Sequence, residues 1–124
     1  MRFTDGGNGT VTDTKTGLIW QKTGSEEKMT WEEALEYANH VADGGSFEWR
    51  LPSIEELFSI VDFSRSDPSI SPIFNCSSDL YWSSSTVVVG PDNAWNVGFG
   101  TGYVYAGYKT NSNYVRCVRN RKEE

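Results

Sequence analysis

Long apolar runs are missing from this 124-residue chain, and its N-terminus is not apolar either. A transmembrane helix needs about 20 consecutive apolar residues, so we expect no insertion into a membrane. Residues 1–5 lack the apolar core of a signal peptide. The sequence therefore fits a cytosolic protein, or an exported protein whose signal lies outside these residues.

Basic residues are scarce relative to acidic ones. The 11 lysines and arginines face 17 aspartates and glutamates, which gives a net charge of −6. Nonspecific nucleic-acid binding depends mainly on the neutralisation of phosphates. The short basic stretch 116–122 is too small to reverse the acidic balance, so we expect no nucleic-acid partner.

Cysteine and histidine are too few for most metal or catalytic motifs. Cys76 and Cys117 form no CxxC pair, and the single His40 has no cysteine near it in sequence. An even pair indicates one disulfide in an exported protein, whereas two free buried thiols are the alternative. Ser83–Ser85 lack the glycines of a nucleophile elbow, and no phosphate-binding glycine loop is visible. We expect no catalytic residue and no resident cofactor.

The most informative segment that is present runs from Trp49 to Leu57. Pro52 fixes its own φ and disfavours the α conformation for the preceding residue. Ser53 then occupies the position of a helix N-cap, and Glu56 three residues later completes a capping box. The segment predicts an extended piece that becomes a helix, with Trp49 directed into the core.

Arg50 is predicted to be a structural residue. A planar guanidinium binds carboxylates through two parallel hydrogen bonds, and both predicted helices are rich in acidic residues. We expect Arg50 to bridge these acids and hold the two helices against the sheet. The same structural role is assigned to Trp49, Pro52 and Trp82.

Strand and helix signals follow one another in a simple order. Strands are expected near residues 3–5, 10–12 and 18–22, and a capped helix from Thr30 to about Asp43, ended by Gly44 and Gly45. The helix after Ser53 is followed by a loop over 63–79, in which Ile73 and Phe74 form a hydrophobic anchor. Strands are then expected over 80–89, 94–99, 103–109 and 114–119. This order predicts one α+β domain with an antiparallel sheet.

A glycine-rich cluster near the N-terminus carries three oxygen-bearing side chains, Asp5, Asn8 and Asp13. These side chains suit either tight turns or a calcium ion. The cluster lacks the spacing and the terminal glutamate of an EF-hand. Turn formation is the preferred interpretation, and no metal site is predicted.

Tyrosine, asparagine and glycine are concentrated in the late part of the chain. Aromatic rings that stack and amides that form paired hydrogen bonds suit carbohydrate or protein ligands. The alternative is that these aromatic residues fill the core beneath the sheet. The candidate ligand-binding residues are Trp95, Asn96, Tyr103, Tyr105, Tyr108, Asn111 and Asn113.

Successive blocks of the sequence resemble, in order, those of one bacterial family. The blocks are residues 5–13 with 16–21, and then 30–34, 49–53, 81–85, 94–99 and 114–119. The family is that of the C-terminal domain of the Legionella collagen-like adhesin. The resemblance implies a single C-type-lectin-like domain over residues 1–122 with a tail at 123–124. In that fold the first and last strands pair, two helices flank them and a long-loop region projects.

The resemblance also implies a function. We expect a non-enzymatic recognition or adhesion module that binds a carbohydrate or an extracellular protein at a bacterial surface or in the periplasm. One alternative is a module that mainly forms homo-oligomers. A second is an oxidase like the formylglycine-generating enzymes, which share the broad fold and use a cysteine pair.

Three departures from related proteins narrow these expectations. Many relatives have a cysteine near the end of the first helix, but residues 37–40 contain none, so a disulfide of Cys117 would join it to Cys76. Calcium-dependent lectins have an acidic residue where Val97 follows Asn96, so calcium is a minor possibility. Glycosaminoglycan binding needs basic clusters, which this acidic chain lacks.

Overall fold

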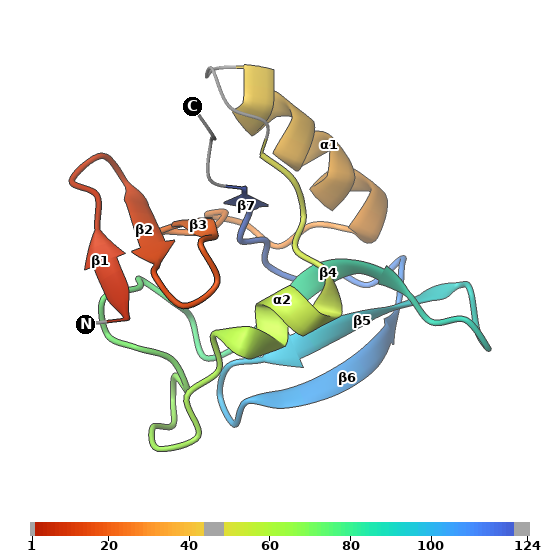
Figure 1. Ribbon diagram of the computed structural model, residues 1–124. Helices are drawn as coiled ribbons and strands as arrows, with labels where there is room; N and C mark the ends of the chain where they lie inside the picture. The colour runs from red at the N-terminus through yellow and green to blue at the C-terminus, as the bar shows by residue number, and fades with distance from the viewer. Residues whose placement is uncertain (1, 44–48, 121–124) are drawn as a thin grey trace.

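The computed structural model describes residues 2–43 and 49–120, in which two helices and two antiparallel sheets form an α+β fold (Figure 1). The α+β class predicted from the sequence is confirmed. The helices are α1 (Trp31–Asp43) and α2 (Ile54–Ser59). The strands are β1 (Phe3–Asp5), β2 (Thr10–Asp13), β3 (Ile19–Gln21), β4 (Leu80–Thr86), β5 (Asn93–Gly98), β6 (Tyr103–Tyr108) and β7 (Val118–Arg119). No helix in these two described ranges is long and apolar enough to cross a bilayer.

The strands form two separate sheets rather than one. The first has the order β1-β2-β3-β7 and the second the order β4-β5-β6, and each neighbouring pair is antiparallel. The last strand pairs with β3, where Trp20 lies opposite Val118, and not with the first strand. The implied pairing of first and last strands therefore needs correction: the chain ends share a sheet, but β2 and β3 lie between β1 and β7.

Both helices begin with the predicted capping boxes. Ser53 Oγ accepts from Glu56 N–H at 3.2 Å, and Glu56 Oε1 accepts from Ser53 N–H at 2.8 Å. Thr30 and Glu33 exchange the equivalent pair of hydrogen bonds at 2.8 and 3.3 Å. Each box satisfies two N–H groups that a helix start leaves without partners. The predicted glycine cap of α1 at residues 44 and 45 lies outside the described residues, as does the tail at 123–124.

Two clusters of buried side chains make up the core. One joins the two sheets and α2, and contains Trp20, Leu57, Ile70, Phe74, Val97 and Phe99. The other lies under α1, and contains Ala34, Ala38, Leu51, Trp82, Ala94, Val115 and Cys117. The predicted anchor of the loop between α2 and β4 is confirmed: Phe74 is buried in the first cluster and Ile73 packs against it, and Ile70 of the same loop is buried there too.

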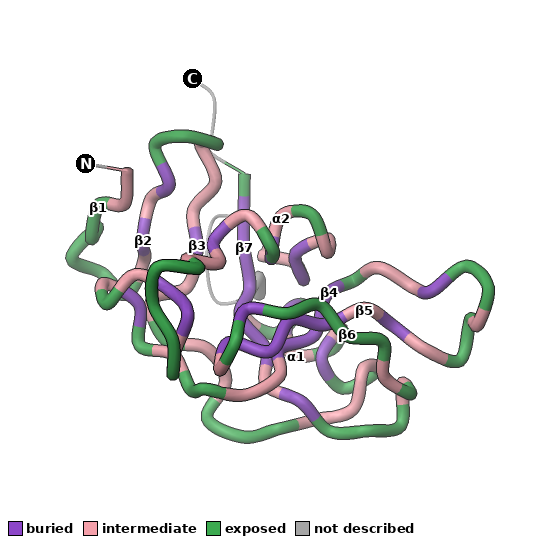
Figure 2. The backbone as a smooth tube through the Cα atoms, turned by 90° about the horizontal axis from the view of Figure 1, so that it is seen from below, coloured by how far each residue is buried: buried purple, intermediate pink, exposed green. Residues whose placement is uncertain are grey.

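The segment that leads into β7 separates these two clusters. Its residues are buried from Val115 to Arg119, and Figure 2 shows this buried path through the centre of the molecule. Because successive side chains of extended backbone point to opposite sides, Cys117 enters the cluster under α1. The neighbouring Arg116 instead points away from that cluster and donates to the carbonyl oxygens of Gln21, Lys22 and Asn75 at 2.5–2.7 Å.

The predicted disulfide is absent, and both cysteines are free thiols. Cys76 packs against the cluster between the sheets, whereas Cys117 belongs to the cluster under α1. The guanidinium of Arg116 lies on the Cys76 side, 5.1 Å from the ring centre of Phe74 and 5.6 Å from that of Tyr81. A disulfide requires Cα atoms closer than about 7 Å and Cβ vectors that converge, which this alternation along the strand does not provide.

Candidate functional site

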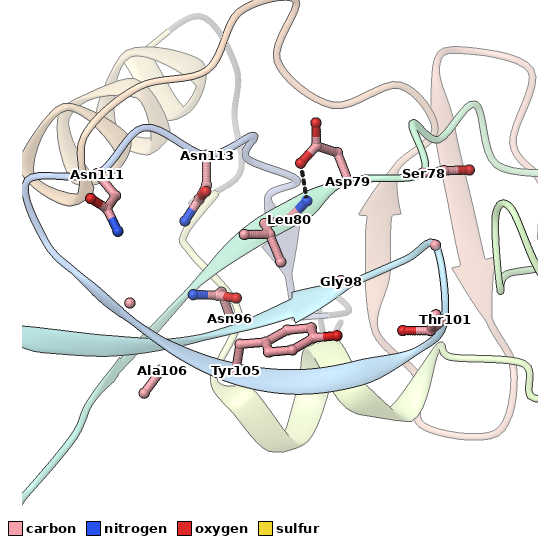
Figure 3. A pocket seen from close by; sticks show the side chains of 12 residues that line it. Ser78, Asp79, Leu80, Asn96, Gly98, Thr101, Tyr105, Ala106, Asn111 and Asn113 are labelled. Atoms are coloured by element: carbon pink, nitrogen blue, oxygen red, sulfur yellow. Dashed lines mark hydrogen bonds between the residues drawn. The ribbon is translucent and has the colours of Figure 1, made fainter.

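A cavity of about 440 Å³ lies over one face of the three-stranded sheet (Figure 3). Residues of β4, β5 and β6 form its floor: Leu80, Asn96, Gly98, Tyr105, Ala106 and Gly107. One end is lined by Ser78, Asp79, Gly100 and Thr101, and Asn111 and Asn113 stand over the floor from the segment after β6. The volume falls in the range of small-ligand sites, about 300–1,000 Å³.

Strand alternation decides which residues of β5 reach the cavity. Val97 lies opposite Tyr81 and Val104 in the sheet and contributes to the core next to α2. Asn96 lies opposite Trp82 and Tyr105 and is directed to the other face, where the cavity is. One strand thus presents an apolar residue to the core and a carboxamide to the cavity.

Two glycines in the strands create the space on this face. A Cβ atom at Gly98 would lie 2.9 Å from Tyr105 Cε2, and one at Gly107 would lie 3.0 Å from Asn96 Nδ2. Gly98 therefore allows the Tyr105 ring to lie against the sheet, and Gly107 leaves room for the Asn96 amide. Larger residues at either position would fill the floor of the cavity.

The segment that covers the floor is anchored at two points. Lys109 N–H donates to Asp92 O at 2.9 Å, and Lys109 O accepts from Trp31 N–H at 3.0 Å. Asn113 exchanges two backbone hydrogen bonds of 2.9 Å with Met29. A wall held by backbone bonds loses little freedom when a ligand binds, which favours affinity.

Asp79 is the only residue that carries a charge at neutral pH in the described lining of the cavity. Its Oδ1 accepts from Leu80 N–H at 2.7 Å, and its Oδ2 lies 2.8 Å from Lys28 Nζ. The hydrogen bond from Lys28 keeps the pKa of the Asp79 carboxyl below its usual value, so the group is ionised at neutral pH. With no lysine or arginine in this described lining, the cavity is neutral to weakly anionic.

Asn96 is the most unusual polar residue of the site. Its side chain is 1% exposed, and its Oδ1 has no hydrogen-bond partner among the described residues. Figure 3 shows its carboxamide in the floor, with the amide groups of Asn111 and Asn113 directed toward it from above. A buried polar atom without a partner is unfavourable for the free protein. Because Asn96 also lines the cavity, its unmet acceptor is a candidate contact for a ligand.

Four of the seven predicted ligand residues line this one cavity: Asn96, Tyr105, Asn111 and Asn113. Trp95 does not line it, because it points to the opposite face of β5 from Asn96. Tyr103 and Tyr108 are about 60% exposed at the two ends of β6 and also lie outside the lining. The structure thus brings the three asparagines together with one of the three tyrosines.

Sequence reasoning missed the remaining lining residues. Ser78 and Asp79 belong to the predicted loop, and only the sheet pairing brings them to the end of β5. The glycines at 98 and 107 did carry a signal, since glycine inside a strand often marks a close approach of backbone or ligand. That signal indicates open space without indicating which side chains surround it.

Comparison with protein-family models assigns residues 9–119 to the Lcl C-terminal domain. The chain belongs to this family. The match covers most of the sequence and agrees with the resemblance to the C-terminal domain of the Legionella collagen-like adhesin. A comparison with curated proteins returned no match. Membership in the Lcl C-terminal domain family is consistent with an adhesion-type module rather than an enzyme.

Arg50, in one of the family-like blocks, pairs with a single helix. Its two terminal nitrogens donate to the two carboxylate oxygens of Glu56 at 2.6 and 2.8 Å, and one of them also donates to Asn120 Oδ1 at 2.9 Å. In the described ranges Arg50 forms no ion pair with α1. Its ion pair therefore connects the extended segment before Pro52 to α2 only, and the expected bridge between both helices is not formed.

The other predicted structural residues of this Lcl-type domain lie in or against the core. Pro52 is buried, and its carbonyl accepts from Ser84 N–H at 2.7 Å. Trp82 is fully buried and donates through Nε1 to the carbonyl of Met29 at 2.8 Å. Trp49 is half-buried, packs against the cluster under α1 and lies under the guanidinium of Arg119 at 5.2 Å.

The oxygens of the N-terminal turn are used within the protein. Asp5 accepts from Gly7 N–H at 2.8 Å, Asn8 Oδ1 accepts from Thr10 Oγ1 at 2.6 Å, and Asp13 is bound by Arg2. In residues 2–43 and 49–120, no three acidic, histidine or cysteine side chains are grouped as a metal site would require. These contacts agree with the turn interpretation of this segment.

Neither thiol nor histidine forms part of the cavity lining among the described residues. Burial raises the pKa of the Cys117 thiol to about 12, and burial also raises the pKa of Cys76. Thiol nucleophiles react as thiolates, whereas these raised pKa values keep both cysteines mainly in the thiol form at neutral pH. His40 is exposed near the end of α1.

Proposed function

We propose that this domain is a non-enzymatic recognition module of the adhesion type, which binds a carbohydrate or a group of an extracellular protein in the cavity over β4, β5 and β6. The proposal places the domain at a bacterial surface, outside the cell or in the periplasm. The observation that carries it is the convergence of Asn96, Tyr105, Asn111 and Asn113 on one cavity. Family membership supports the same kind of role.

Recognition suits the chemistry of the cavity better than catalysis does. Its lining offers carboxamides, hydroxyls and one carboxylate, and that carboxylate is already paired with Lys28. A general acid or base would need a pKa near the working pH, whereas the pKa of Asp79 is lowered away from it by Lys28. Polar groups of fixed position and little reactivity are typical of a binding site.

We further propose that binding requires neither calcium nor another cofactor. Asp79 is the one carboxylate in the described lining, and calcium sites in proteins use six to eight oxygen ligands that commonly include several carboxylates. Ligand binding should therefore be the same in millimolar calcium and in a chelator. Loss of binding in the chelator would contradict this part of the proposal.

An array of glycans and extracellular proteins is the direct test, probed with and without calcium. The wild-type domain is compared with Tyr105→Ala, which removes a ring from the cavity, and with Tyr108→Ala as the matched control on the same strand. We expect ligands that are retained by the control and lost by Tyr105→Ala. Array binding that is unchanged in Tyr105→Ala, or an array without any ligand, would contradict the proposed site.

A second function, self-association, is favoured by the free edge of the second sheet. Among the described residues β6 pairs with β5 on one side only, and its sequence from Tyr103 to Tyr108 contains neither charge nor proline. Edge strands without such protection tend to pair with other chains. Light scattering should then detect a homodimer, and Val104→Lys should return it to the monomer. A monomer at all concentrations would exclude this role.

A further inference from the structure

We infer that the cavity binds an uncharged, polyhydroxylated ring, that is, a neutral saccharide unit, with a hydroxyl on the Asn96 carboxamide and an apolar ring face on Tyr105. This inference deepens the proposed function and rests on it. It identifies Asn96 as the residue that orients the ligand and determines its class.

The argument begins with the unmet hydrogen bond at the floor. Asn96 is 1% exposed and its Oδ1 is unpartnered within the described residues, and the residue lies in the lining of the cavity. A hydroxyl is the ligand group that fits a carboxamide in either orientation of the amide, because it both donates and accepts a hydrogen bond. An ammonium can only donate, and a carboxylate can only accept.

The other two asparagines extend this reasoning to more than one hydroxyl. Asn111 and Asn113 direct their amides toward Asn96 from the opposite side of the cavity (Figure 3). Three carboxamides around one space provide both donors and acceptors at several angles. A ring that carries several hydroxyls matches such a set, whereas a ligand with a single polar group would leave other amides unmet.

The charges of the cavity lining favour a neutral saccharide over an acidic one. The described lining contains no lysine or arginine, and Asp79 contributes a carboxylate at one end. Lys28 compensates this carboxylate through an ion pair of 2.8 Å but is not itself part of the lining. A uronic acid or a sulfated sugar would bring a negative charge to a site without a cation, which is unfavourable.

Tyr105 provides the apolar surface that one face of a pyranose ring requires. Gly98 allows the ring to lie on the sheet, because a Cβ at that position would be 2.9 Å from Tyr105 Cε2 and 3.1 Å from Leu80 Cδ2. The side chain is nevertheless 44% exposed and lines the cavity. The C–H groups of a sugar can cover this exposed aromatic surface while its hydroxyls reach the amides.

The test uses nuclear magnetic resonance of the side-chain amides in 15N-labelled protein. Glucose, galactose and mannose are titrated, each to high millimolar concentration, together with glucuronate as the anionic counterpart of glucose. We expect at least one neutral sugar to shift the Asn96 and Asn111 amide signals in a saturable way. Glucuronate should bind at least tenfold more weakly than the neutral sugar that binds most tightly.

Two variants and one matched control link the signal to the floor of the cavity. Asn96→Leu should abolish saccharide binding, and Gly107→Ala should weaken it by displacing the Asn96 amide. Asn93→Leu is the control, because Asn93 lies on the same strand but its Nδ2 donates to Gly90 O at 3.2 Å, outside the cavity lining. The Tyr103 to Tyr108 amide signals report whether each variant retains the sheet.

Several outcomes would overturn the inference. They are the absence of any shift with all three neutral sugars, glucuronate binding as tight as that of the best neutral sugar, or full binding by a folded Asn96→Leu. The array experiment keeps this failure separate from that of the proposed function. If the array finds a peptide or an acidic glycan whose binding depends on Tyr105, the proposed recognition site is supported and the neutral saccharide is contradicted. If the array finds no ligand, the proposed site and the saccharide inference are both contradicted.

Discussion

Val97 and Asn96 are neighbours in β5, yet they lie in opposite environments. Val97 is fully buried in the apolar cluster next to α2. Asn96 is almost equally buried, but its Oδ1 has no partner among the described residues and it lines an open cavity. Trp20 Nε1 in the apolar cluster also lacks a partner among the described residues, so neither burial nor an unpaired atom alone distinguishes a site residue from a core residue; the position of Asn96 at the cavity does.

The contrast assigns different roles to two regions of the second sheet. The core region comprises the face toward α2 and, on the opposite face, Trp82 and Ala94, which pack under α1. The cavity region lies on that opposite face next to Trp82 and presents Asn96, with Asn111 and Asn113 above it. The following predictions test this division, beginning with the largest effect.

Phe99→Ala should destabilise the protein strongly, because Phe99 continues β5 on the core-facing side. The ring is fully buried and packs edge to face against Tyr81 at 5.3 Å. Loss of a buried phenylalanine costs about 3–5 kcal/mol, which urea unfolding would detect. The control Phe58→Ala removes a ring that is 41% exposed and should cost about 1 kcal/mol or less. Equal losses in the two variants would contradict the assignment of Phe99 to the core.

Arg50→Lys should have a smaller effect, because it removes one of two hydrogen bonds to Glu56 but retains the charge. The pair is partly exposed, with 41% of the Arg50 side chain accessible, so after solvent screening the loss is about 1 kcal/mol or less. The melting temperature should decrease measurably, while ligand binding stays unchanged. Reduced ligand binding with an unchanged melting temperature would place Arg50 at the site instead of in the scaffold.

The pH dependence of the free energy of unfolding should reveal the contribution of the Arg50–Glu56 ion pair. The hydrogen bond from Arg50 lowers the pKa of Glu56 in the folded protein. Such a group contributes stability above its unfolded pKa, about 4.3, and this contribution is lost as the pH falls through the lower folded pKa. Unfolding measured from pH 6 to pH 3 should show this loss in the wild type and a smaller loss in Arg50→Gln. Identical pH profiles would show that the pair contributes nothing.

Reductant should have no effect on the melting temperature, because the two thiols lie in separate clusters. The protein unfolded in denaturant without reductant should contain two titratable thiols, and the native protein should react slowly with thiol reagents. Intact mass should be the same with and without reductant. A mass 2 Da lower without reductant would reveal the disulfide that this arrangement excludes.

Local sequence signals predicted the helix starts and most strands. The capping boxes at Ser53 and Thr30 involve residues three positions apart, so their partners were visible in the sequence. The separation into two sheets and the pairing of β7 with β3 depend on contacts between distant residues. The disulfide prediction failed for the same reason, since a count of cysteines does not show in which core cluster each one lies.

The site was predicted in part, through composition. Enrichment in asparagine and tyrosine correctly indicated a polar surface near the end of the chain, but it included Trp95, which faces the other side of β5. Asp79 was not predicted because β4 and β5 bring it beside Gly100 only in the folded protein. The key property of Asn96, an acceptor without a partner in the part of the chain that the structure describes, has no local signature in sequence.

The most direct test of whether Asn96 serves ligand recognition and not the fold is the free energy of unfolding of Asn96→Leu, compared with that of Asn93→Leu. Leucine has a shape similar to asparagine and removes the unmet acceptor at position 96, whereas at position 93 it removes the hydrogen bond to Gly90. We predict that urea unfolding will find Asn96→Leu as stable as the wild type or more stable by about 1 kcal/mol, and Asn93→Leu less stable by about 1 kcal/mol. A loss of more than about 1 kcal/mol in Asn96→Leu would mean that Asn96 serves the fold, and would contradict the assignment of the cavity region to ligand recognition.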